Sequence, residues 1–150
     1  MTARIVSWLG GAVVVLGLVG ASRADLDQAK AEPNLEKRSK LALDNAEQAL
    51  KAAREAYDKG DTAQVAARAK EIGESVELAN TSLQETGKNP RKSPKWFKRA
   101  EIVTRNLLRR LDSFQQEMSV ADRPLLDAVK AKVQQVHDSL LLGVMEGKQK

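Results

Sequence analysis

Residues 62–86, TAQVAARAKEIGESVELANTSLQET, decide the fold of this chain. Apolar side chains recur there at alternating spacings of four and three residues, at Val65, Ala69, Ile72, Val76, Ala79 and Leu83. Such a heptad is typical of a helix that buries one face against other helices, as in a coiled coil. Gly73 weakens this helix slightly, because glycine in a helix interior costs about 1 kcal/mol relative to alanine. The pattern therefore predicts one long helix that Gly87 ends.

Three other stretches carry the same helical spacing, and short polar turns separate them. They cover residues 33–59, 94–118 and 122–146. Their apolar stripes are Leu43, Ala46, Leu50, Ala53 and Tyr57; Trp96, Ala100, Val103, Leu107, Leu111, Phe114 and Met118; and Leu126, Val129, Val133, Val136, Leu140 and Val144. No stretch beyond the first 24 residues alternates as a strand would, so the sequence predicts an all-α protein.

Capping residues mark where three of these helices begin. Asp61 is the expected N-cap of residues 62–86, and Gln64, three residues later, resembles a capping box. Ser93 is the expected cap of the next helix, with Pro94 in its first turn, where a missing N–H costs nothing. Asp122 is the expected cap of the last helix. Gly60 is suited to end the first helix, because glycine takes a positive φ readily.

The short connections predict two antiparallel hairpins, each made of two consecutive helices. Stacked face to face, the hairpins would form an up-and-down antiparallel four-helix bundle over residues 33–147, followed by a frayed tail at 148–150. A homodimer that extends the bundle is the main alternative. The chain has no cysteine, so its stability must come from helix packing rather than from disulfides.

The first hairpin loosely resembles one tetratricopeptide-type unit. The residues that carry the resemblance are Ala53, Tyr57, Gly60, Asp61 and Ala69, over about one repeat length. The chain lacks the early Trp and the later Pro of that pattern, and the second hairpin does not repeat it. Because such arrays generally need three or more repeats, we interpret the likeness as convergent helix-hairpin chemistry.

Residues 1–24 differ in kind from the rest of the chain. A short basic start precedes an apolar run at residues 5–22, and the small residues Ser22 and Ala24 suit a signal peptidase site. The pattern predicts a signal peptide cleaved after Ala24, a flexible segment at residues 25–32 and a periplasmic or secreted protein. An uncleaved membrane anchor is the alternative, because a run of about 18 residues is the lower bound for a spanning helix. A buried core helix is the third interpretation.

Positive charge gathers in one segment. Residues 88–110 hold nine basic residues, and Glu101 is their only acid. Within this segment, Lys98, Arg105 and Arg109 lie about 160–200° around the helix from Leu107, opposite the apolar stripe. The candidate anion- or partner-binding residues are Arg91, Lys92, Lys95, Lys98, Arg99, Arg105 and Arg109.

Clustered cations favour an anionic partner, such as lipid head groups, lipopolysaccharide, a cell-wall polymer or an acidic protein. Contact with a membrane would be peripheral unless the leader is retained. In the alternative interpretation, acids of the first two helices balance part of the charge and water solvates the rest. Nucleic acid is disfavoured by the predicted export. Trp96 is expected in the core, whereas Phe97 is expected to be exposed and available for stacking.

The sequence contains no motif that names a reaction, a metal site or a cofactor site, and we expect no enzyme. His137, the only histidine, falls about 40° from Val133 and is interpreted as a structural residue bonded to a neighbouring helix. A haem or small-ligand site at His137, with Met118 as a second haem ligand, is an alternative. Glu71 and Glu74 are expected on a solvated face. The leading hypothesis is an exported, non-enzymatic structural or interaction module of the cell envelope.

Overall fold

A computed structural model describes residues 21–147 of the chain. These residues form five α-helices and one short 3-10 helix, and they contain no strand, as the sequence predicts. The elements are α1 (Ala21–Ala31), α2 (Leu35–Asp58), α3 (Thr62–Glu85), α4 (Pro94–Glu117), η1 (Arg123–Leu126) and α5 (Asp127–Glu146). Most of the predicted signal peptide, residues 1–20, and the predicted tail, residues 148–150, lie outside the described residues.

The helix ends follow from local side-chain chemistry. The Asp61 carboxylate accepts a hydrogen bond from the Gln64 backbone N–H at 3.0 Å, which confirms the predicted cap of α3. Gly60 has a φ of +75°, as the end of α2 requires. Ser93 occupies the predicted cap position of α4, but its side chain makes no capping hydrogen bond. Asn34 caps α2 through a 2.9 Å bond from the Lys37 N–H, so the helix begins at Leu35, two residues beyond the predicted start at residue 33.

The last predicted helix is divided in two. Residues 123–126 form the 3-10 turn η1, and the α-helical part begins only at Asp127. Pro124 contributes no backbone N–H, and the Leu125 N–H bonds to the Asp122 carbonyl three residues back at 3.0 Å, which is the 3-10 pattern. Asp122 therefore precedes η1 and does not cap α5.

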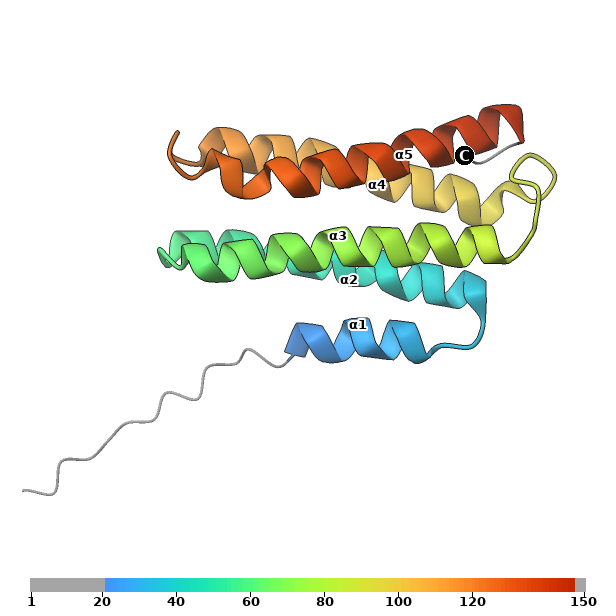
Figure 1. Cartoon of the computed structure of the whole chain (residues 1–150), viewed down its shortest axis with the longest axis horizontal. Coiled ribbons are helices and arrows are strands. Elements are labelled where there is room, and N and C mark those ends of the chain that lie inside the picture. Colours follow the sequence, from blue (N-terminus) through green and yellow to red (C-terminus); the bar gives the residue numbers. More distant parts are fainter. Residues whose placement is uncertain (1–20, 148–150) are drawn as a thin grey trace, which may run out of the picture.

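The helices pack as two hairpins, α2 with α3 and α4 with α5 (Figure 1). Between the hairpins, α2 packs on α4 and α3 packs on α5. Figure 1 shows that each of these two pairs runs in the same direction. Two of the four neighbouring pairs are therefore parallel, which differs from the predicted up-and-down antiparallel arrangement. The connection at residues 86–93 permits this, because it takes the chain from α3 diagonally across to α4.

Two ion pairs mark the parallel packing of α2 on α4. Asp44 meets Arg99 at 3.4 Å, and farther along both helices Arg54 meets Glu117 at 3.0 Å. Residue numbers increase together along the two helices, so the helices point the same way. The Arg54 guanidinium carbon also lies 5.4 Å from the centre of the Phe114 ring, a cation–π contact at the same junction.

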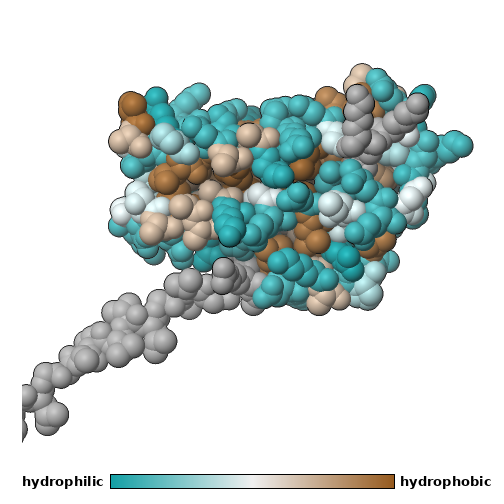
Figure 2. Space-filling model, in the orientation of Figure 1, coloured by the Kyte–Doolittle hydropathy of each residue, from teal (hydrophilic) through white to brown (hydrophobic). Residues whose placement is uncertain are grey.

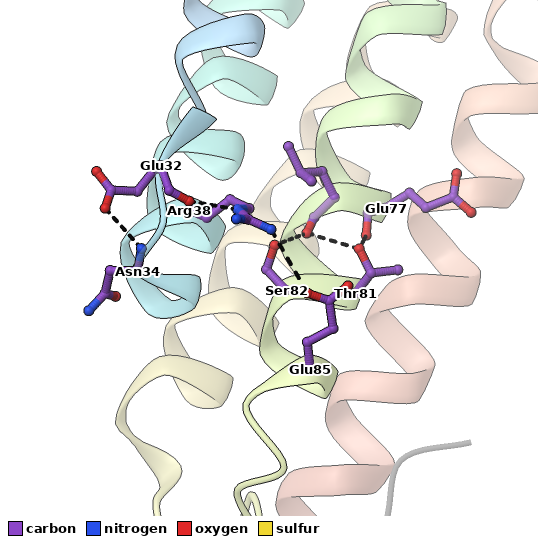
Figure 3. Close-up of polar contacts among 8 residues, drawn as sticks. Glu32, Asn34, Arg38, Glu77, Thr81, Ser82 and Glu85 are labelled. Atoms are coloured by element: carbon purple, nitrogen blue, oxygen red, sulfur yellow. Dashed lines mark hydrogen bonds and ion pairs between the residues drawn. The ribbon is translucent and has the colours of Figure 1, made fainter. Parts of the chain in front are cut away.

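Helix α1 forms a third layer beneath α2 (Figure 1). Residues 25–31, expected as part of a flexible segment, are helical there, and Leu26 and Ala29 are buried. The turn that follows is held by Arg38, whose Nε donates to the Glu32 carbonyl at 2.8 Å. The Arg38 guanidinium also lies 3.9 Å from the Glu85 carboxylate at the end of α3 (Figure 3). This residue therefore joins the ends of three helices.

The predicted apolar stripes form most of the core, and all six stripe residues of α3 are buried. The predicted stripe of residues 94–118 is buried at Ala100, Leu107, Leu111, Phe114 and Met118, but Trp96 and Val103 are only partly buried. Phe97 is buried with 1% of its surface exposed, whereas Trp96 is only partly buried, so the expectation for these two aromatics is wrong. The buried face also includes Thr104, whose hydroxyl donates to the Ala100 carbonyl at 2.9 Å. A hydroxyl satisfied in this way is compatible with the core but invisible in an apolar pattern.

Candidate functional site

The predicted basic row, defined here as Lys98, Arg105 and Arg109, runs along the outer side of α4. All three residues are exposed, whereas Ala100 and Leu107 on the opposite side of the helix are fully buried. This matches the position about 160–200° from Leu107 that the helical advance of about 100° per residue predicts. The row is a surface feature that bundle packing does not cover.

Two of the predicted cations are balanced by acids. Arg105 Nε lies 3.6 Å from a carboxylate oxygen of Glu101, one turn earlier on α4. Arg99 reaches across to Asp44 on α2. Among the seven candidate cations, only Arg99 is therefore neutralised by an acid of the first hairpin, as the alternative interpretation expects. The charge of Arg105 is neutralised by an acid of its own helix.

The other cations of the candidate set on α4 are unpaired. Lys95, Lys98 and Arg109 form no ion pair with any acid of residues 21–147. The Lys95 ammonium lies 5.2 Å from the centre of the Trp96 ring, a cation–π contact. Arg109 donates to the Asn106 side-chain oxygen at 3.3 Å, which leaves its charge uncompensated.

Arg91 and Lys92 lie in the connection before α4. Their backbone N–H groups both donate to the Asn89 side-chain oxygen, at 2.9 and 3.3 Å, so this asparagine shapes the turn. Together with Asn89 and Glu146 they border a hollow of about 340 Å³ where α5 ends. The seven predicted residues thus divide between this loop and the outer side of α4.

His137 lies in the contact between α5 and α4. It is 9% exposed, and its Nδ1 is 3.3 Å from the Thr104 hydroxyl and 3.9 Å from the Glu101 carboxylate. This position fits the structural interpretation of a histidine bonded to a neighbouring helix. Met118 is the residue that follows α4, fourteen residues beyond Thr104, and the helix between them rises about 20 Å. His137 and Met118 are therefore too far apart to ligate one haem.

A buried polar cluster is the feature that the sequence analysis missed. The Arg68 guanidinium contacts the Glu71 carboxylate at 2.8 Å, and only 7–8% of each residue is exposed. The Asn45 amide of α2 donates to Glu71 at 3.0 Å and to Ser75 at 2.9 Å. The expectation that Glu71 is solvated is wrong, whereas Glu74 is exposed as predicted. The available signal was the spacing of Arg68, Glu71 and Ser75, which follows the apolar stripe at its edge.

Two hollows flank α3. One, of about 520 Å³, lies between α1 and α3 and is bordered by Arg68 and Glu71. The other, of about 350 Å³, lies between α3 and the η1–α5 segment and is lined mainly by small apolar residues. Figure 2 shows apolar residues gathered between helices α3 and α5. The border of each hollow includes Lys70 and Glu74, so neither hollow attracts charge of one sign.

Comparison with protein-family models, with curated proteins and with solved structures gives no match for this chain. Among residues 21–147, no helix is both long enough and apolar enough to span a bilayer. In the same part of the chain, no three His, Asp or Glu side chains are grouped so that they could hold a metal ion. The unpaired cations of α4 and of the loop before it are therefore the site on which a function can be argued.

Proposed function

We propose that this chain is an exported, non-enzymatic interaction module that binds an anionic partner through the outer side of α4. The observation that carries the proposal is the exposure of Lys98 and Arg109 without an acidic partner among the described residues. Lipid head groups, lipopolysaccharide, cell-wall polymers and acidic proteins share the required negative charge. Clustered cations raise both the encounter rate and the affinity for such partners.

The arrangement of charges on α4 supports binding over simple solvation. Like charges four residues apart destabilise a helix by about 0.2–0.5 kcal/mol per pair. Helix α4 carries two such pairs, Lys95 with Arg99 and Arg105 with Arg109, and acids relieve only one member of each. An anionic partner would relieve the remaining repulsion, so the same charges that weaken the isolated helix favour its complex.

Export is the second part of the proposal, and it rests on the apolar run at residues 5–22. Cleavage after Ala24 would leave the buried residues Leu26 and Ala29 of α1 in the mature chain. N-terminal sequencing of the protein recovered from its cell tests this step. A sequence beginning at Asp25 supports cleavage, and one beginning at Met1 shows that the leader is retained.

Elution from immobilised dextran sulfate in a salt gradient tests anion binding. The full chain is compared with a variant that carries K98E, R105E and R109E. The control variant carries K37E, K51E and K59E, which changes the net charge equally at exposed lysines of α2 and its end. We expect the first variant to elute at much lower salt than the control, with equal helical circular dichroism. Equal loss in both variants would reduce the effect to net charge and overturn the proposal.

A further inference from the structure

Large apolar side chains are exposed at four places in residues 21–147, and three of them lie on the helices α4 and α5 themselves. Ile102 is 45% exposed, Leu141 39% and Met145 66%. The fourth, Val120, belongs to the turn that follows α4. A protein that only needed a solvated basic surface would gain nothing from exposed apolar side chains beside it.

Ile102 lies directly beside the basic row. It is four residues after Lys98 and three before Arg105, so about 40–60° of helix rotation separates it from each. It is therefore exposed on the same outer side of α4 as these cations. The row and this apolar residue would meet any flat surface together.

Leu141 and Met145 approach the row from α5. His137 touches Thr104, and Lys130 pairs with Asp112, so residue numbers on the two helices run in opposite directions along their contact. Leu141 and Met145 follow His137 by one and two turns along the same edge of α5. This register sets them level with the first two turns of α4, on either side of the level of Lys98.

We infer that this outer edge of the α4–α5 hairpin binds the surface of an anionic lipid bilayer, and we call it the bilayer-binding edge. The inference rests on the proposed function and names its partner. Lys98, Arg105 and Arg109 face the phosphate head groups, and the neighbouring apolar side chains, Ile102, Leu141 and Met145, enter the interface between head groups and acyl chains. A soluble anionic polymer would satisfy the cations but leave these apolar side chains in water.

The composition of the edge favours a bilayer over a folded protein partner. A bilayer surface needs only exposed cations and exposed apolar side chains, and the edge presents both. Three apolar residues are also few for the core of a protein–protein interface.

Probes at single positions test the inference in the full chain, whichever form of the leader it carries. The chain has no cysteine, so M145C and I102C each place one environment-sensitive fluorophore at the bilayer-binding edge. Q48C places the same fluorophore at an exposed position of α2 as the control. Vesicles contain phosphatidylcholine alone or mixed with phosphatidylglycerol, and lipids carrying a quencher report the depth of the probe.

On the mixed vesicles we expect blue-shifted, lipid-quenched fluorescence at positions 145 and 102, and an aqueous spectrum at position 48. Adding K98E and R109E should lower the affinity for the mixed vesicles, measured from this signal, by at least about twentyfold. Each cation near an anionic surface contributes about fivefold to that affinity. An apolar leader that held the chain on both kinds of vesicle would not reproduce this dependence on position. Unchanged thermal unfolding shows that the variants remain folded.

Three results would overturn the inference: aqueous probes at positions 145 and 102 on the mixed vesicles, equal immersion of position 48, or an undiminished signal with K98E and R109E. Burial of the probes in concentrated protein without vesicles would identify a second copy as the partner and overturn it as well. If dextran sulfate binding depends on the basic row while the probes stay in water, the proposed function stands and only the inference of bilayer binding is overturned.

Discussion

Arg68 and Glu71 form an ion pair inside the protein, where two charges cost free energy unless their partners are nearly complete. Their partners are incomplete here, because Arg68 Nε and Asn45 Oδ1 are buried with no hydrogen-bond partner in the described structure. Such a pair adds little net stability compared with apolar residues of the same size, yet removal of one charge leaves the other buried and unpaired. The cluster therefore makes the folded state sensitive to single substitutions.

We predict that Glu71→Ala lowers the free energy of unfolding by about 3 kcal/mol, because Arg68 then remains buried without its counter-charge. Urea unfolding followed by circular dichroism measures the change. The matched control is Glu74→Ala, one turn away, where the carboxylate is half exposed and lies 3.9 Å from Lys70. That change should cost less than about 0.5 kcal/mol. Equal effects of the two substitutions would contradict the burial of Glu71.

The spacing of Glu71 with Arg68 and Ser75 places it at the edge of the apolar stripe of α3, but this spacing does not show that other helices cover that edge. Glu74 lies farther around the helix from the stripe. Glu71 and α1 border the same hollow, and Asn45 of α2 bonds to its carboxylate, so the surroundings of Glu71 come from other helices. Residue-level burial at the edge of a stripe depends on which helices pack there, and the chain's own periodicity does not contain that information.

At the scale of the helix, the positions of the ends were largely predictable and the direction of the buried face was less so. Asp61 and Gly60 act through their own backbone and its nearest neighbours, so local sequence determines them. The buried face of α4 depends on where α2 and α5 meet it. That dependence explains why Phe97 replaces Trp96 in the core. Helix α1 was missed for another reason, because Leu26 and Ala29, its buried residues in the range 25–31, make too short a pattern to recognise.

Two glycines in or near α3 should respond oppositely to alanine. A Cβ at Gly73 would meet only the Lys132 side chain, at an ordinary 3.8 Å, so Gly73→Ala should raise the free energy of unfolding by about 1 kcal/mol. Gly60→Ala should lower it by about 1–2 kcal/mol, because φ there is +75°. Thermal unfolding of both variants measures the difference. A loss of stability for Gly73→Ala would mean that α3 and α5 approach more closely than described.

At the scale of the whole molecule, the sequence predicted the four helices of the two hairpins and their pairing, but not how the hairpins stack. Two amphipathic hairpins bury their apolar faces whether the helices facing each other are parallel or antiparallel, so the stripes favour neither arrangement. The difference lies in polar contacts at the edges, such as Arg54 with Glu117 between α2 and α4. The candidate site was more predictable, because the outer side of one helix is defined by that helix alone. Its apolar border from α5 required the register of two helices.

The stacking can be tested by zero-length carbodiimide cross-linking. Lys132 Nζ of α5 lies 3.3 Å from a carboxylate oxygen of Glu77 on α3, and these helices would lie diagonally apart in an all-antiparallel ring. We predict a cross-linked peptide that joins Glu77 to Lys132. Lys132→Arg should abolish this product, because a guanidinium keeps the ion pair but forms no stable amide. The Lys130–Asp112 contact within the α4–α5 hairpin serves as the internal control, since both arrangements contain it. Formation of the control product without the Glu77–Lys132 product would show that the hairpins stack in the antiparallel order.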